Sequence, residues 1–230
     1  MNDAGQAARP SFIAKLRYAV EHPAYVWLRL RGIVESRTGY DHRQWSRIAV
    51  YRELFKYVAS LAPAKLTALE IAPGGDSSPW RGVGFREYHH VDYPAFDICS
   101  DRMARTFDVI IADQVFEHLR WPYRAARGVH AMLAPGGIFI NLTPFLIRVH
   151  DAPVDCSRWT ETGMKHLLAE AGFPIDAIKT GAWGNRECVI ANLTKKGWAK
   201  FGWGRPLHNE PEFPVVIWAI AQRQAEALPC

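Results

Sequence analysis

The stretch LEIAPGGDSSPW, residues 69–80, decides how the chain is interpreted. An apolar run ends in Glu70-Ile71, and Ala72-Pro73-Gly74-Gly75 follows at once. Adjacent glycines let the backbone turn sharply and let another group approach the main chain closely. This pattern, a buried strand that ends in an acid and is followed by a glycine turn, has two interpretations. The turn is either a plain loop or a place where a ligand lies against the bare backbone.

The rest of the chain alternates short apolar runs with amphipathic segments, which is typical of an α/β fold with a mostly parallel sheet. The apolar runs do not alternate strictly, as expected of strands covered on both faces. Strands are predicted at 66–71, 87–91, 107–112, 138–143, 176–181 and 215–222, with a tight turn at 135–137 before the fourth. Helices are predicted at 43–60, from Pro122 and after an N-cap at Thr160. In such sheets, ligands bind beyond the carboxyl ends of the strands.

Four segments in this order resemble the motifs of class I S-adenosylmethionine-dependent methyltransferases of the type 11-like group. They are Glu70–Gly74, His90–Tyr93, Phe107–Ile110 followed by Glu117–Leu119, and Leu133–Gly137. The resemblance covers roughly residues 45–180 and implies a Rossmann-like sandwich with an antiparallel last strand. Few residues separate Asp92 from Phe107, so we expect a member trimmed between its second and fourth strands.

The resemblance implies S-adenosylmethionine as cofactor and assigns its contacts residue by residue. They are Glu70, Ala72, Pro73, Gly74, Asp92, Tyr93, Asp97, Ile98, Asp113 and Gln114. Asp92 lies about 20 residues past the turn and offers two oxygens to two ribose hydroxyls. Asp97 would accept from the adenine amine while Ile98 covers the ring.

Methyl transfer to an oxygen atom usually needs a base near neutral pH, for which histidine is the common choice. His150 is the predicted general base, and either Asp151 or Asp155, the latter a predicted catalytic residue, would orient its ring. His118 is a second catalytic candidate, with a packing role as the alternative. The segment HDAPVDCSRWT (150–160) resembles a pattern from methyltransferases of glycan and lipid-sugar assembly. The expected activity is therefore O-methylation of a sugar or glycan precursor.

Two other functions remain open. One is a methyltransferase of phenols or secondary metabolites. The other is a non-catalytic binding protein, because Ala72 and Asp76 stand where the family usually has glycine. Magnesium is a further cofactor to consider, since ubiquinone-type and small-RNA-terminal O-methyltransferases use a Glu-x-x-Glu-His cluster and a later His. The matching positions here are Gln114, Glu117, His118 and His150. Gln114 is an amide at the first acid position, which disfavours an ion, and no metal is expected.

The predicted organisation is an N-terminal helical extension at 1–42 and a methyltransferase domain at 43–230, with a tryptophan-rich insertion at about 182–213. Residues 11–35 either pack on the core or contact a membrane surface. Trp183, Trp198 and Trp203 either line a sugar cleft or pack inside.

The net charge of +5 is diffuse, without a run of five Lys or Arg, so we expect a small-molecule or glycan substrate and no nucleic acid. The four cysteines show no Cys-x-x-Cys spacing, and the N-terminus lacks an apolar signal-peptide core. Both features predict a cytoplasmic protein. Nothing in the sequence indicates an oligomeric state.

Overall fold

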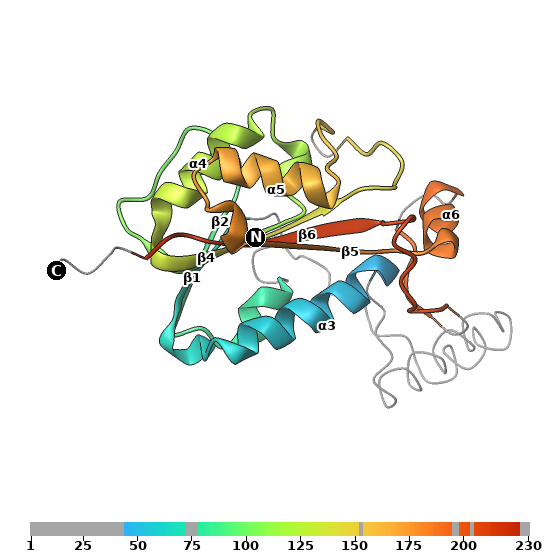
Figure 1. Ribbon diagram of the computed structural model, residues 1–230, viewed down its shortest axis with the longest axis horizontal. Helices are drawn as coiled ribbons and strands as arrows, with labels where there is room; N and C mark the ends of the chain where they lie inside the picture. Colours follow the sequence, from blue (N-terminus) through green and yellow to red (C-terminus); the bar gives the residue numbers. More distant parts are fainter. Residues whose placement is uncertain (1–43, 72–77, 152–153, 195–197, 203–204, 226–230) are drawn as a thin grey trace, which may run out of the picture. The chain divides into compact units, whose positions relative to one another are not determined.

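The computed structural model describes residues 44–71, 78–151, 154–194, 198–202 and 205–225 (Figure 1). Its centre is a six-stranded sheet in the order β2-β1-β3-β4-β6-β5. The strands are β1 (Thr67–Ile71), β2 (Glu87–Val91), β3 (Phe107–Asp113), β4 (Leu133–Pro144), β5 (Ile178–Trp183) and β6 (Val216–Gln222). Strands β2, β1, β3 and β4 pair in parallel, whereas β6 runs antiparallel to both β4 and β5. The predicted α/β fold with an antiparallel last strand is confirmed.

Helices lie on both faces of this sheet (Figure 1). Helix α3 (Trp45–Ser60) lies on one face, and α4 (Pro122–Met132) and α5 (Glu161–Glu170) lie on the other. The hydroxyl of Thr160 accepts a hydrogen bond from the Gly163 N–H at 3.1 Å, so the predicted N-cap of α5 is confirmed. A fourth helix, α6 (Arg186–Thr194), lies in the range predicted as an insertion. Four short 3-10 helices complete the described elements: η1 (Pro63–Lys65), η3 (Pro79–Val83), η4 (Phe116–His118) and η5 (Ile175–Ala177).

The centre of the core is β3, whose side chains are almost all buried. Val109, Ile110 and Ile111 are completely buried, and β-branched side chains favour the extended backbone of a strand. Strand β3 lies between β1 and β4, so both of its edges are hydrogen-bonded. This strand therefore holds the residues that follow it, 113–118, in a fixed position.

The predicted boundary of the fourth strand is wrong. We expected a turn at 135–137 before the strand, but β4 begins at Leu133 and includes those residues. Its pairing with β3 jumps from Phe107↔Leu133 to Val109↔Ile138, and Gly136 has a φ of +77°. The turn is thus a bulge inside the strand, and glycine adopts its left-handed backbone without a steric cost.

Residues 92–106, between β2 and β3, contain neither helix nor strand. The parallel half of the sheet accordingly ends at β2, which agrees with the expected trimming. The predicted extension at 1–42 lies outside the described residues, as does the stretch 72–77. Within the described part of the chain, no helix is long and apolar enough to cross a membrane.

Candidate functional site

The carboxyl ends of the parallel strands gather polar residues at one edge of the sheet. Strand β1 ends at Ile71, β2 at Val91, β3 at Asp113 and β4 at Pro144. The carboxyl edge of such a sheet is where ligands of this class of fold bind. Two predicted groups lie here, the cofactor residues around β1–β3 and the catalytic residues after β3 and β4.

Asp113, a predicted cofactor residue, is a buried anchor between distant segments. Its Oδ2 accepts hydrogen bonds from the Tyr51 hydroxyl at 2.6 Å and from the Trp80 indole N–H at 3.0 Å. These partners come from α3 and η3, so the carboxylate ties both elements to the end of β3. Its other oxygen, Oδ1, is buried with no hydrogen-bond partner among the described residues.

Gln114 stands in a strained conformation directly after β3. Its φ is +61°, a region that non-glycine residues adopt rarely and that often occurs at functional sites. Its N–H donates to the Leu142 carbonyl at 2.9 Å, which holds the residue against β4. The Gln114 amide nitrogen and the Thr143 hydroxyl are buried without a hydrogen-bond partner in the described part of the protein. Buried polar groups are normally paired, so these atoms fit a cofactor that carries its own donors and acceptors, as S-adenosylmethionine does.

Glu70 is occupied by protein donors. Its Oε1 accepts from the Ser78 hydroxyl at 2.7 Å, and its Oε2 accepts from the Tyr88 hydroxyl. Burial raises the pKa of Glu70, against the lowering effect of these two hydrogen bonds. Burial and the same contact raise the pKa of Tyr88 well above its ordinary value, so its proton stays in place. Glu70 therefore joins β1 to β2 and η3, whatever further contact it makes with a cofactor.

The nucleoside residues predicted from the sequence follow β2. Asp92 comes directly after Val91, at the strand's carboxyl end, and Tyr93 beside it is 67% exposed. Asp97 accepts a hydrogen bond from the Cys99 N–H at 2.9 Å, and the Ile98 side chain is buried in the core. Of the expected cofactor contacts, Ala72, Pro73 and Gly74 lie outside the described residues. The remaining assignments to cofactor groups stay predictions.

Glu117 and His118 form η4 with Phe116, just beyond Gln114. The Glu117 side chain is completely buried, and neither of its oxygens has a hydrogen-bond partner among the described residues. Burial raises the pKa of Glu117 to about 8. The His118 Nε2 lies 3.7 Å from Glu117 Oε1, and its Nδ1 lies 2.5 Å from the Val154 carbonyl oxygen. That carbonyl can only accept, so Nδ1 carries the proton and Nε2 is left with a lone pair.

His150 reaches the same place from the loop after β4. The rings of His118 and His150 have centroids 5.0 Å apart and are inclined by 67°. The Nδ1 of His150 lies 3.4 Å from Asp155 Oδ2, and the same oxygen accepts from the His150 backbone N–H at 2.8 Å. Burial lowers the pKa of His150, against the raising effect of Asp155. The predicted pairing of His150 with Asp155 is thus present in the structure.

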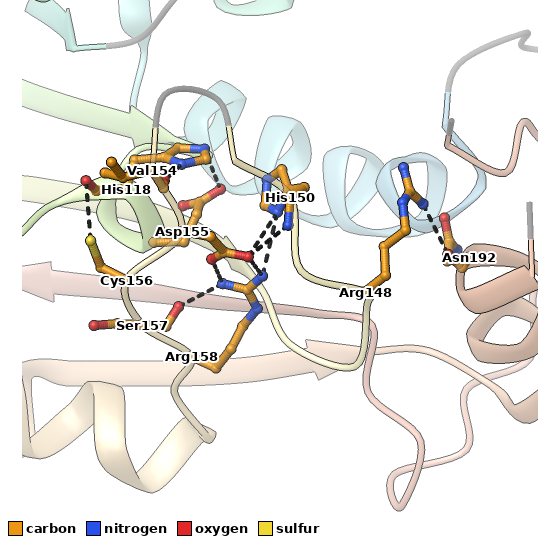
Figure 2. A network of polar contacts seen from close by, with 10 residues as sticks. His118, Arg148, His150, Val154, Asp155, Cys156, Ser157, Arg158 and Asn192 are labelled. Atoms are coloured by element: carbon orange, nitrogen blue, oxygen red, sulfur yellow. Dashed lines mark hydrogen bonds and ion pairs between the residues drawn. The ribbon is translucent and has the colours of Figure 1, made fainter. Parts of the chain in front are cut away.

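Asp155 is itself held by Arg158, a residue whose place in the sequence fits either a ligand clamp or a structural ion pair. Figure 2 shows the guanidinium facing the carboxylate, with Nη1 at Oδ1 and Nη2 at Oδ2, the latter at 2.6 Å. Burial alone would raise the pKa of Asp155, but the bond from Arg158 outweighs it and lowers the pKa to about 2. The Cys156 N–H donates to the Glu117 carbonyl at 2.7 Å, so this segment is fastened to η4. Asp155 is therefore a fixed anion beside His150.

Glu117 was not among the site residues predicted from the sequence. Its position in a Glu-His pair after a strand is plain in the sequence, but its complete burial is not, because a glutamate in a short 3-10 helix is usually exposed.

The tryptophans of the tail were expected either to line a sugar cleft or to pack inside the protein. Trp183 is buried and donates to the Leu207 carbonyl at 3.3 Å, so it packs inside. Trp198 is half-buried with its ring centroid 5.0 Å from that of His150, and Trp203 lies outside the described residues.

Residues 52–141 match the family model of a methyltransferase domain. This part of the chain is therefore similar to a methyltransferase domain. The match runs from α3 into β4 and ends before His150. The expected enzyme class and cofactor, a methyltransferase that uses S-adenosylmethionine, are confirmed at this level. No curated protein matches the sequence.

Solved methyltransferase structures are similar to this chain at low sequence identity. An S-adenosylmethionine-dependent methyltransferase from Mesorhizobium loti is 16% identical with a TM-score of 0.50, over 73% of this chain and 96% of that one. The 1,6-didemethyltoxoflavin-N1-methyltransferase of Burkholderia thailandensis is 14% identical with a TM-score of 0.48, over 97% of this chain and 93% of that one. At 16% identity, the first likeness supports the fold and leaves the acceptor open.

Proposed function

We propose that the methyltransferase transfers the methyl group of S-adenosylmethionine to an oxygen atom of a hydroxylated acceptor, a sugar or glycan precursor. The observation that carries the proposal is the cluster of His118, His150 and Glu117 beyond β3 and β4, where Asp155 holds the ring of His150. A hydroxyl group is a weak nucleophile until its proton is removed, whereas the neutral form of an amine attacks through its lone pair without first losing a proton. A cluster that can take up this proton therefore favours oxygen over nitrogen.

The residues of the cluster have separate tasks in this proposal. Asp155 accepts from the Nδ1 proton of His150, which leaves Nε2 free to take the proton of the acceptor hydroxyl. As the proton leaves, the acceptor oxygen forms its bond to the methyl carbon, and the carbon–sulfur bond of the sulfonium breaks. The sulfonium donor supplies the reactivity, and the protein supplies position and exclusion of water. The half-buried ring of Trp198 beside His150 offers an aromatic surface to the apolar face of a sugar.

A panel of acceptors tests the proposal. The protein is incubated with S-adenosylmethionine and matched methyl glycosides, phenols, primary amines and thiols, and S-adenosylhomocysteine is measured. Turnover with glycosides supports the sugar assignment, and turnover with phenols alone moves the substrate to the phenol class. Turnover with amines or thiols alone contradicts oxygen transfer. Calorimetric titration with S-adenosylmethionine decides whether the chain binds the cofactor at all, because a binding protein for another ligand would release no heat with it.

His150→Ala then tests the site with the best acceptor. We expect turnover to fall on the order of a hundredfold while cofactor affinity stays within about twofold. His166→Ala, an exposed histidine of α5, is the matched control and should keep full activity. His118→Ala should lower cofactor affinity or stability, because His118 follows the strand at the centre of the sheet. Full turnover of the His150 variant over pH 6 to 9, roughly the range in which imidazole acts as a base, would remove His150 from the reaction.

A further inference from the structure

One carboxylate oxygen and two imidazole nitrogens converge beyond η4, from Glu117, His118 and His150. One such atom from each residue lies within 4.8 Å of the other two. Two ligands of one ion, each about 2.0 to 2.2 Å from it, are separated by about 3 to 4 Å. A small movement of the side chains therefore brings all three atoms into the range of a single divalent ion.

The buried carboxylate is the strongest sign that something belongs between these side chains. Glu117 has no exposed surface, and both of its oxygens are without a hydrogen-bond partner in the described part of the chain. A carboxylate is normally buried only where it is paired or bound to a metal. The His118 Nε2, at 3.7 Å from Oε1, is too far away for a hydrogen bond but close enough to share an ion with it.

Both histidines are already oriented as metal ligands. Metal-binding histidines usually donate their other ring N–H to a carboxylate or a backbone carbonyl, which fixes the ring and its tautomer. The Nδ1 of His118 faces the Val154 carbonyl, and the Nδ1 of His150 faces Asp155. Figure 2 shows His150 beside Asp155, with Arg158 holding the Asp155 carboxylate from below. His118 is thus left with Nε2 as its ligand atom. In His150 the Nδ1 lies 3.4 Å from both Asp155 Oδ2 and Arg158 Nη2, so its Nε2 is the nitrogen that remains for an ion.

We propose that Glu117, His118 and His150 bind a divalent transition-metal ion of the Zn²⁺ or Co²⁺ kind. Two imidazoles and one carboxylate suit these ions, whereas Mg²⁺ prefers a shell of oxygen atoms. Three protein ligands leave at least one coordination position open, as in catalytic rather than structural sites. Gln114 is not needed in this ligand set, so its amide does not argue against the ion.

The inference rests on the proposed O-methylation in one respect, the task of the ion. An acceptor hydroxyl bound at the open position loses its proton to water more readily, because the ion stabilises the oxygen anion. The oxygen then takes the methyl group, and the sulfonium becomes a thioether. His150 cannot bind an ion and a proton through Nε2 at once, so in the loaded enzyme the ion replaces the imidazole as the activating group.

Metal binding is measured first without cofactor or acceptor. The full chain is treated with a chelator, dialysed and titrated with Zn²⁺ by calorimetry and with Co²⁺ by visible absorption. We expect one ion per chain and d–d bands of cobalt with nitrogen ligands. Glu117→Gln and His150→Gln should each weaken binding at least tenfold, and Mg²⁺ at the same concentration should not displace Co²⁺. Thermal unfolding of both variants shows whether they fold. If Glu117→Gln does not fold, the test rests on His150→Gln.

Cys156→Ser and His208→Gln are the controls. Cys156 is exposed beside the His118 carbonyl, and His208 pairs with Glu210 on the surface, so each offers Zn²⁺ a different binding place. Both control variants should bind the ion as the wild type does. The proposal is overturned if Zn²⁺ and Co²⁺ do not bind, if either control abolishes binding, or if binding survives in folded His150→Gln. Because these titrations contain no acceptor, failure of the ion and failure of O-methylation are separate results.

Discussion

The Asp155 carboxylate holds His150 in two ways, with one oxygen 2.8 Å from the backbone nitrogen and 3.4 Å from the ring Nδ1. The two residues lie five positions apart, so the loop between them closes on itself. Arg158 binds both oxygens of the same carboxylate, which fixes it in place. A histidine held from both its main chain and its ring keeps Nε2 pointed in one direction, whether it meets a proton or an ion.

Asp155→Asn tests this positioning role. The amide keeps the shape but loses the charge that favours an N–H at Nδ1, so kcat should fall by about 10- to 100-fold. The KM for the acceptor and the affinity for S-adenosylmethionine should change little, because Asp155 touches neither in the proposal. Asp155→Glu should recover part of kcat. Equal kcat values for wild type and Asp155→Asn would show that the carboxylate serves only the loop.

The two hydrogen bonds that Asp113 accepts should stabilise the fold whether or not the cofactor is bound. Tyr51→Phe removes one hydrogen bond to a buried carboxylate and should lower the free energy of unfolding by about 1 to 3 kcal/mol. Asp113→Ala leaves both Tyr51 and the Trp80 indole without this acceptor and should cost more. Urea unfolding without cofactor measures both effects. Tyr57→Phe in the same helix is the control for a tyrosine hydroxyl, and a loss as large as that of Tyr51→Phe would mean that Asp113 is not the cause.

The sheet is largely predictable because its strands have simple physical signatures. Residues 87–91 are predicted as a strand and form β2 with the same bounds, and 107–112 form all but the last residue of β3. The apolar, β-branched run of 107–112 specifies a strand locally, whereas 87–91 contains a single β-branched residue, Val91. Strand β5 begins two residues later than predicted, because Ile175–Ala177 first forms the 3-10 helix η5.

Helix α6 escapes prediction for a physical reason. Its only buried residues are Cys188 and Asn192, so it lacks the apolar stripe by which helices are recognised. A weaker signal is present in Asn185, whose side-chain oxygen accepts from the Cys188 N–H at 2.8 Å as an N-cap does. The surrounding Trp, Gly and Asn residues hide that signal.

In the site, local pairs are predictable and distant ones are not. The short spacing of His150 from Asp151 and Asp155 predicts that a nearby acid contacts it, and the structure shows that Asp155 is that acid. The contact of Tyr51 with Asp113 spans 62 positions, and no local pattern connects the two residues. The isolation of Glu117 likewise arises from how β3, η4 and the 154–158 segment pack together, which a single sequence does not encode in any short motif.

Asp92 should dominate binding of the nucleoside part of the cofactor. Asp92→Ala removes the acceptor predicted for both ribose hydroxyls and should weaken S-adenosylmethionine binding by about 2 to 4 kcal/mol. Calorimetry measures the affinity, with Asp176→Ala, an exposed acid of η5, as control. The assignment fails if Asp92→Ala binds the cofactor as tightly as the control.

A substitution at Gly74 tests whether the two glycines in residues 69–80 form only a turn or also contact a ligand. A branched side chain at a position where the cofactor meets bare backbone would occupy the cofactor's space, so Gly74→Val should abolish S-adenosylmethionine binding while the domain stays folded. Gly82→Val is the matched control, because a Cβ atom at Gly82 meets nothing within 4 Å. The control should bind normally, and circular dichroism of both variants checks the fold. If Gly74→Val binds the cofactor normally, the glycines form only a turn. The residues after β2 and β3 would then hold the cofactor.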